Sequence, residues 1–387
     1  MNSFTQHGTS IALYAVCFVL AAILAGLAQI FGRSYRSAEL TPSFTQRSRP
    51  NRIFWVLSLI IPLLLASFRW QVGTDYSTYI YLYDLFSEIE TLSQFFRSVL
   101  DIEPSFIILN VLIKAIFNDY ILVFAICSLI TLAFFYRAIE DYHEKSSVML
   151  AIVVFLFLLY PTTLNIVRQM IAVAIVFYAT RYIFQRKYAK AAIWMIVALS
   201  FHYSALMILP FWFLRGDRRW QKNIRIVLFA LLIFIVVGDL VFHDAFSQLP
   251  LFGLLADTTT EGTRLSYGLL LLRLPIIVPV LVFRKRLIAQ DERNYYWIIL
   301  MVFEVAFGHL GYIFDVFNRF ALYFAVSWVV LLPALVRCMR TRGAQYRMGA
   351  YVLLATVGLW VYNTGIQNYG DVLPYKSIFD AYFSGVL

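Results

Sequence analysis

The sequence predicts an all-α polytopic integral membrane protein with about 10–12 transmembrane helices. Of its 387 residues, 61% are hydrophobic and only 14% are charged, and the mean hydropathy is +0.75. A soluble domain is closer to half apolar and a quarter charged. This composition excludes a soluble enzyme with a Rossmann or barrel core, a disordered scaffold and a nucleic-acid-binding module, so we expect no nucleic-acid partner despite the net charge of +10.

Apolar segments long enough to cross a bilayer recur along the chain. A crossing helix needs about 20 residues, with roughly 17 to 25 the usual range. The predicted crossings are 11–31, 53–68, 120–136, 147–160, 164–184, 224–242, 266–283, 295–312, 320–336 and 348–362. Two further stretches are ambiguous and are candidates for re-entrant half-helices: 105–117 is short, and 191–213 has basic loops on both sides.

Charge then orients these segments. No Lys or Arg precedes Arg33, so the chain lacks the basic start of a signal peptide, and we expect a retained first helix with its N-terminus outside. If 105–117 does not cross and 191–213 enters and leaves from the same side, most of the 32 Lys and Arg residues fall in cytoplasmic loops, as the positive-inside rule requires. If both stretches crossed, the basic residues of 181–190 would lie outside. The predicted cytoplasmic segments are 33–52, 137–146, 181–190, 215–225, 284–293 and 337–347.

The predicted outer side carries the acidic segments 69–104 and 243–263 and the C-terminal tail 363–387. We expect amphipathic helices in 69–104 and a single transmembrane domain over 1–387. The basic residues that orientation does not explain are Arg69, Arg97, Lys114, Arg168, Arg264, Arg273, Arg319 and Lys376. A cation in or near the membrane is costly and is usually paired or functional. Arg69, Arg168 and Arg319 stand out because each has polar neighbours at helical spacing.

The first polar group runs from Arg69 to Tyr76 and includes Tyr79. Gly73 permits a tight turn, Thr74 or Asp75 can cap the helix that follows, and Asp75 and Tyr79 would share a face of that helix. Two interpretations stay open at this point. One is a capped helix start with an Arg–Asp pair, and the other is a phosphate-binding Arg beside a carboxylate that accepts a proton.

The second and third groups lie nearer the middle of the chain. Asn165, Arg168 and Gln169 have i, i+3 and i+4 spacing, so they are predicted on one side of a helix, facing the protein interior as a ligand site or a structural polar knot. His202, between Ser200 and Ser204, is predicted at the turn between two half-helices. No second His or carboxylate sits at ligand spacing, so we expect no metal and no cofactor.

The fourth group lies in the last third. Glu304 is in the middle of a span and His309 follows it, an arrangement that suits a proton relay in a transporter. Asp315 and Arg319 form an i, i+4 pair near the outer boundary. In the tail, Tyr375 follows a proline and either covers a site or anchors the chain at the interface.

Four of these segments resemble the EpsG-like family of Wzy-type O-antigen and exopolysaccharide polymerases. They are Arg69-Trp-Gln-Val-Gly-Thr-Asp-Tyr-Ser-Thr-Tyr, Asn165-Ile-Val-Arg-Gln-Met-Ile-Ala, Ser200-Phe-His-Tyr-Ser-Ala-Leu and Leu373-Pro-Tyr-Lys. The resemblance implies a glycosyltransferase that acts on undecaprenyl-diphosphate-linked oligosaccharide repeats. It places the enzyme in the bacterial inner membrane, with the chemistry at the outer face. Together with the orientation predicted from charge, this makes both termini periplasmic. It also implies a flippase and a chain-length regulator as partners.

Within that expectation, the chemistry needs cations for the departing diphosphate and a base for the acceptor hydroxyl. Arginine suits phosphate because its planar fork binds two oxygens at once. We expect Arg168 and Arg319 to bind the diphosphate, with Arg69 or Arg264 assisting, and Asp75 or His202 to be the base. The residues expected to contact the substrate otherwise are Asn165, Gln169, Tyr79 and Tyr375.

Two other classes stay open. A lipid-linked oligosaccharide flippase or other transporter would also have many spans and buried charges, with Glu304 and His309 at its centre. A glycosyltransferase that uses a sugar on polyprenyl monophosphate would be expected to carry an Asp-Asp or Asp-Glu motif in the first outer segment. That segment has Asp75 alone near the membrane, and the next acid is Asp84.

Overall fold

The computed structural model describes residues 3–36, 46–87, 89, 92–98, 102–142, 147–213, 267–311 and 315–383. The chain divides into two compact units, Met1–Leu206 with Gly349–Leu387, and Met207–Met348. The expectation of a single domain over 1–387 stays a prediction. The predicted crossing 224–242, the predicted outer segment 243–263 and Arg264 lie outside the described residues.

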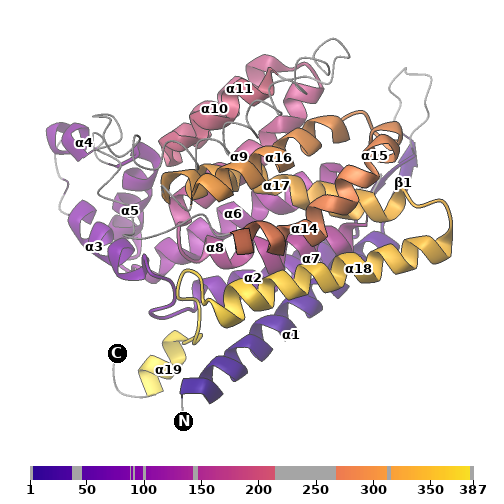
Figure 1. The fold of residues 1–387 in the computed structure, drawn as a ribbon. Coiled ribbons are helices and arrows are strands. Elements are labelled where there is room, and N and C mark those ends of the chain that lie inside the picture. Colours follow the sequence, from indigo (N-terminus) through magenta and orange to yellow (C-terminus); the bar gives the residue numbers. More distant parts are fainter. Residues whose placement is uncertain are drawn as a thin grey trace. The chain divides into compact units, whose positions relative to one another are not determined.

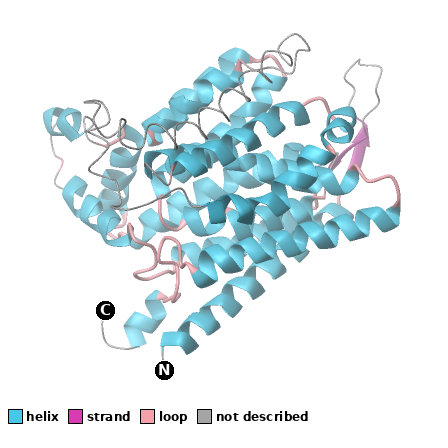
Figure 2. Cartoon of the chain, in the orientation of Figure 1, coloured by secondary structure: helices cyan, strands magenta, loops and turns pink. Residues whose placement is uncertain are grey.

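Helices make up most of the first unit (Figures 1 and 2). Their bounds are α1 Ser3–Ile30, α2 Arg52–Ser67, α3 Tyr76–Ser87, α4 Leu92–Ser98, α5 Pro104–Ile116, α6 Ile121–Tyr142, α7 Val148–Leu158, α8 Tyr160–Thr163, α9 Val167–Phe184, α10 Tyr188–Phe201 and α19 Ile378–Phe383. A 3₁₀ turn at Tyr203–Ile208 leads towards the second unit. A π-helical turn at Val361–Ile366 ends α18, Arg342–Trp360, whose last part belongs to the first unit.

The second unit is also helical where it is described. It contains α11 Leu209–Trp212, α14 Tyr267–Val282, α15 Arg284–Gln290, α16 Asn294–Leu310, α17 Asp315–Arg337 and the first part of α18. Phe211 of α11 packs edge-on against Phe303 of α16 and Phe324 of α17, with ring centroids 4.6 and 4.7 Å apart. These rings form part of the unit's apolar interior.

The all-α polytopic membrane architecture is confirmed. Five described helices are long and apolar enough to cross a membrane by themselves: Gln6–Ile30, Ile121–Tyr142, Val167–Phe184, Val316–Arg337 and Arg342–Ile366. Every predicted crossing other than 224–242 coincides with a described helix, although several of these helices have 10–17 residues. The total of about 10–12 crossings stays a prediction.

One short sheet interrupts the helical pattern. Strand β1, Arg33–Arg36, pairs antiparallel with β2, Gln46–Arg49, in the register Arg33↔Arg49 to Arg36↔Gln46. It is the magenta element in Figure 2. The sequence prediction contained no strand. The connector between two apolar spans pairs its backbone with itself, which satisfies amide groups that neither helix can reach. Asn51 then caps α2, because its Oδ1 accepts a hydrogen bond from the Ile53 amide at 3.1 Å.

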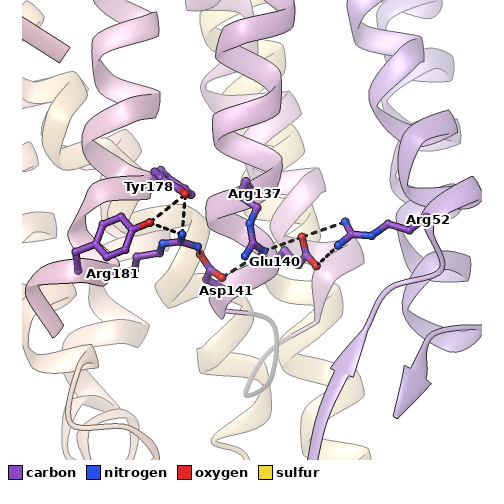
Figure 3. A network of polar contacts seen from close by, with 7 residues as sticks. Arg52, Arg137, Glu140, Asp141, Tyr178 and Arg181 are labelled. Carbon is purple, nitrogen blue, oxygen red and sulfur yellow. Dashed lines mark hydrogen bonds and ion pairs between the residues drawn. The ribbon is translucent and has the colours of Figure 1, made fainter. Parts of the chain in front are cut away.

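The ends of three helices meet in a charged network (Figure 3). Arg52 begins α2, Glu140 and Asp141 lie in the last turn of α6, and Arg181 lies in the last turn of α9. Arg181 Nη1 donates to Asp141 at 2.6 Å, and Arg52 pairs with Glu140 at 3.3 Å. These residues belong to the segments predicted as cytoplasmic from charge alone.

Helix α9 connects this network to the opposite end of the bundle. It has 18 residues and so is about 27 Å long. Arg181 lies in its last turn and Arg168 in its first turn, so the two arginines mark opposite ends of the same helices. The short turn at 185–187 reverses the chain into α10, whose C-terminal end returns to the level of Arg168.

The structure bears differently on the two ambiguous stretches, 105–117 and 191–213. Helix α5 starts beside Arg168 and ends at Ile116, shortly before α6 begins at the same end of the bundle, so 105–117 does not traverse it. In the stretch 191–213, α10 ends at Phe201 and the backbone at His202 is extended, with φ −162° and ψ 120°. The predicted helix break at His202 is therefore present. Whether this stretch leaves from the side it entered stays a prediction.

Candidate functional site

The carboxylate of Glu103 joins two predicted site residues. Its Oε2 accepts a hydrogen bond from Arg168 Nη1 at 2.5 Å, and its Oε1 lies 2.5 Å from His202 Nδ1. The Tyr203 amide also donates to Oε1 at 3.3 Å. Glu103 occupies the N-cap position of α5 but makes no capping hydrogen bond. Its side chain is 5% exposed, whereas those of Arg168 and His202 are 21% and 19% exposed. The acid is thus buried beneath two accessible groups.

Electrostatics favour the ionised form of Glu103. Burial raises the pKa of its carboxyl, but the hydrogen bond from His202 and the positive charge of Arg168 lower that pKa by more, so the net shift is downward. An ionised carboxylate has no proton to donate. His202 Nδ1 is therefore the donor in this contact, and the hydrogen bond fixes the orientation of the ring. The second ring nitrogen, Nε2, lies on the side of the ring away from Glu103.

The contacts of Arg168 orient its guanidinium. The guanidinium carbon lies 5.6 Å from the centroid of the Phe106 ring, on the first turn of α5. The Phe106 ring in turn lies 5.7 Å from that of Tyr79 on α3. Arg168 Nε is buried and has no hydrogen-bond partner within the described ranges. Burial raises the pKa of Tyr79 to about 12, so its phenol is neutral. Arg168 thus keeps donor capacity beyond its pairing with Glu103.

A second group of contacts is centred on Asn165, three residues before Arg168. The Oδ1 atom of Asn165 accepts hydrogen bonds from Thr74 Oγ1 at 2.7 Å and from the Asp75 amide at 2.9 Å. Asn165 precedes α9, which begins at Val167. The expectation that Asn165, Arg168 and Gln169 share one helical face is wrong, because the turn before α9 directs Asn165 to α3 instead. Gln169 lies inside the helix bundle and is 2% exposed.

The C-terminal segment 368–377, which we call the strap, lies against residues 68–74. The Trp70 amide donates to Lys376 O at 2.8 Å, the Gly73 amide to Asp371 O at 3.0 Å and the Thr74 amide to Gly370 O at 3.1 Å. Tyr375 anchors the strap, since its amide donates to Ser10 Oγ at 2.9 Å and its hydroxyl donates to Leu65 O at 3.0 Å. Figure 1 accordingly shows α19 near the start of α1.

Arg69 lies beneath the strap and is enclosed. Its side chain is 1% exposed, and its guanidinium carbon lies 4.6 Å from the centroid of the Phe124 ring. Its three nitrogen atoms have no hydrogen-bond partner within the described ranges, and no ion pair with Asp75 is found there. The tyrosines that interact electrostatically with the Arg69 guanidinium are Tyr14, Tyr76, Tyr79 and Tyr160. The face of Phe124 is thus the aromatic contact of this enclosed cation among the described residues.

The sequence matches the EpsG family over residues 52–377, which includes every residue of the site described above except those of α1. The chain belongs to the EpsG family. Membership indicates a polysaccharide polymerase-like function of the glycosyltransferase kind in a multi-pass membrane protein. Neither the comparison with curated proteins nor that with solved structures gives a match.

Two further predicted site residues of this EpsG-family chain belong to the second unit, Met207–Met348. Arg319 is exposed on α17 of the second unit, and Arg264 falls outside the described residues. Their expected roles stay predictions. In the same unit, Arg273 pairs with the buried Glu304 at 3.3 Å, which accounts for one basic residue that orientation left unexplained.

Glu103 is the candidate site residue that the sequence did not single out. It was one of several acids in the outer segment, and its partners lie 65 and 99 residues further along the chain. One local signal was present. Glu103 directly precedes Pro104, the first residue of α5, where Ser, Thr, Asp or Asn is the usual cap. A glutamate at that position, facing an apolar helix, indicates a role other than capping.

Proposed function

We propose that this EpsG-family protein polymerises oligosaccharide repeats linked to undecaprenyl diphosphate at the outer face of the bacterial inner membrane. The donor is the growing glycan on its lipid diphosphate, and the acceptor is a hydroxyl of the next lipid-linked repeat. The observation that carries the proposal is the Glu103 carboxylate, which holds both a histidine base and an arginine cation. Family membership and the multi-pass architecture supply the reaction class and the setting.

In the proposed step, His202 Nε2 takes the proton of the acceptor hydroxyl while that oxygen attacks the anomeric carbon of the donor. A new glycosidic C–O bond forms as the bond between the anomeric carbon and the diphosphate oxygen breaks. The lipid diphosphate leaves with the electron pair. General-base catalysis of this kind contributes typically 10²–10⁴-fold to a rate.

Arg168 serves the leaving group. The diphosphate gains negative charge as the bond breaks, and a guanidinium within reach stabilises that charge more in the transition state than in the ground state. Arg168 uses Nη1 for Glu103, which fixes the orientation of the fork. Because Nε is buried, Nη2 is the donor that we assign to phosphate oxygens. Arg319 and Arg264 are proposed as further cations for the diphosphate. Arg69 is proposed to assist through its positive charge from its enclosed position.

The transporter alternative rests on Glu304. Its pairing with Arg273 at 3.3 Å supplies a counter-charge for the buried carboxylate, which is a sufficient structural reason for its presence. Glu103 and His202 form the pair that we assign to chemistry. The alternative is kept as an outcome of the experiment below.

The test uses purified full-length protein in lipid vesicles with an undecaprenyl-diphosphate-linked repeat unit. We expect a ladder of glycans on gels, and its loss in His202→Gln and Glu103→Gln. Matched controls are His7→Gln and Glu292→Gln, which change the same residue types away from the site and should leave the ladder intact. Transbilayer movement of the repeat with no new glycosidic bond would instead identify a flippase.

A further inference from the structure

The side chain of Asn165 is the point where three segments meet. Its Oδ1 receives hydrogen bonds from Thr74 and Asp75, as described above. Its Nδ2 lies against Gly370 of the strap, at 3.1 Å from the place where a Cβ on that glycine would be. The side-chain amide of Asn165, three residues before Arg168, therefore contacts both the turn that precedes α3 and the strap.

Two glycines make this close approach possible. Gly73 has φ +98° and Gly370 has φ +81°, a region that residues with a Cβ rarely adopt. A Cβ on Gly73 would lie 2.8 Å from the backbone oxygen of Leu164. Together with the two backbone hydrogen bonds that join 73–74 to 370–371, these contacts fix the strap against residues 73–75 and 164–165.

The polar groups at this junction remain available to a ligand. Thr74 is exposed, and Asp75 and Asn165 are half-buried. Within the described part of the chain, the side-chain donor near the Asp75 carboxylate is Thr74 Oγ1 at 3.3 Å, whose single hydrogen is shared with the shorter bond to Asn165. A carboxylate has about four acceptor sites, so most of its capacity is unused. Carboxylates and amides, held rigidly, are groups that hydrogen-bond sugar hydroxyls.

We propose that Thr74, Asp75 and Asn165 form a subsite for glycan hydroxyls, and that the strap is its positioning element. The inference rests on the proposed function, since it assigns a place for the sugar next to the arginine that handles the diphosphate. It also gives Asp75 and Glu103 different roles. Asp75 binds the sugar, and Glu103 with His202 supplies the base. The strap acts through Asn165, whose amide it holds in the orientation that Thr74 and Asp75 require.

The experiment measures binding of the lipid-diphosphate-linked repeat to full-length His202→Gln protein in detergent, so that no turnover occurs. Thr74→Val removes the hydroxyl that donates to Asn165 at nearly constant volume, and Thr74→Ser retains it. We expect Thr74→Val to raise Kd about tenfold and Thr74→Ser to change it less than about twofold. Gly370→Ala should also raise Kd about tenfold, because its Cβ presses on the Asn165 amide.

Gly358→Ala is the matched control for Gly370→Ala, since nothing lies within 4 Å of a Cβ at Gly358. If Gly370→Ala proves unstable, the comparison of Kd between Thr74→Val and Thr74→Ser tests the subsite by itself. Equal Kd values for Thr74→Val, Thr74→Ser and Gly358→Ala would overturn the subsite. Wild-type protein that binds the repeat without polymerising it overturns the proposed reaction and leaves the Thr74 comparison valid. Absence of any binding counts against both.

Discussion

Glu103 Oε1 and His202 Nδ1 lie 2.5 Å apart, although 99 residues separate them in the chain. Glu103 begins α5 and His202 follows the end of α10, so the pair joins two helix ends at one end of the bundle. A second contact supports the same junction, because Ser105 Oγ donates to Ser200 Oγ at 2.7 Å. The histidine thereby has a fixed orientation, which is what a proton acceptor in a group-transfer site requires.

Glu103→Gln should lower kcat by about 10²-fold or more, because an amide can donate to Nδ1 and so stabilise the wrong tautomer of His202. The protein should still bind the lipid-linked repeat, since the diphosphate contact is assigned to Arg168. Steady-state polymerisation rates, with Glu292→Gln as the matched control, measure this. A kcat within twofold of wild type would show that the carboxylate does not set the tautomer.

Arg168→Lys should be nearly as inactive as Arg168→Ala. Lysine keeps the charge but lacks the planar fork that can pair with Glu103 and phosphate oxygens together. Rates of polymerisation at saturating acceptor, compared with those of the exposed Arg342→Lys, check this expectation. Full activity in the lysine variant would mean that charge alone is sufficient and that the fork geometry has no role.

Lowering the pH should weaken the Glu103 cluster. The folded-state pKa of Glu103 is lower than its ordinary value of 4.5, so the stabilisation from its pairing is fully present above that value. It is lost as the pH falls through the folded-state pKa. The difference in unfolding temperature between wild type and Glu103→Gln should therefore narrow as the pH falls below about 5. A difference that does not narrow in that range would contradict the assignment of an ionised carboxylate.

The charged network around Asp141, at the other end of the bundle, allows a half-buried arginine to be compared with an exposed one. The side chain of Arg181 is 16% exposed and pairs with Asp141, whereas that of Arg137 is 44% exposed. We expect Arg181→Met to lower the unfolding free energy by about 2–3 kcal/mol, because a buried carboxylate loses a partner. Arg137→Met should cost less than about 1 kcal/mol. Reversible unfolding in detergent measures both, and equal losses would refute the distinction.

Two helical glycines should respond in opposite directions to alanine. A Cβ on Gly308 would clash with the guanidinium of Arg273, which is held by Glu304, whereas a Cβ on Gly358 meets nothing within 4 Å. Gly358→Ala should raise stability by up to about 1 kcal/mol through helix propensity. Gly308→Ala should lower it, because the Arg273–Glu304 pair must shift. Unfolding temperatures in one detergent compare the two, and stabilisation by both would show that Arg273 moves without cost.

The sequence by itself determined the membrane class, the positions of most helices and the residues that orientation does not explain. Apolar length and the distribution of basic residues are local properties, and a bilayer requires both. The segments around Arg69, Arg168 and His202 were selected for the same reason, since polar groups in apolar surroundings need a cause. The family followed from those segments and is confirmed.

Tertiary structure decided which polar groups meet. Glu103 became the partner of Arg168 and His202, Asn165 turned from the helix face to Thr74 and Asp75, and Arg69 was enclosed rather than paired. Helical spacing predicts contacts three or four residues apart, whereas these pairs are 65 to 99 residues apart. Such contacts depend on how the helix ends and the strap pack together. A buried charge needs an opposite charge or an aromatic ring nearby, and packing determines which of these lies within reach.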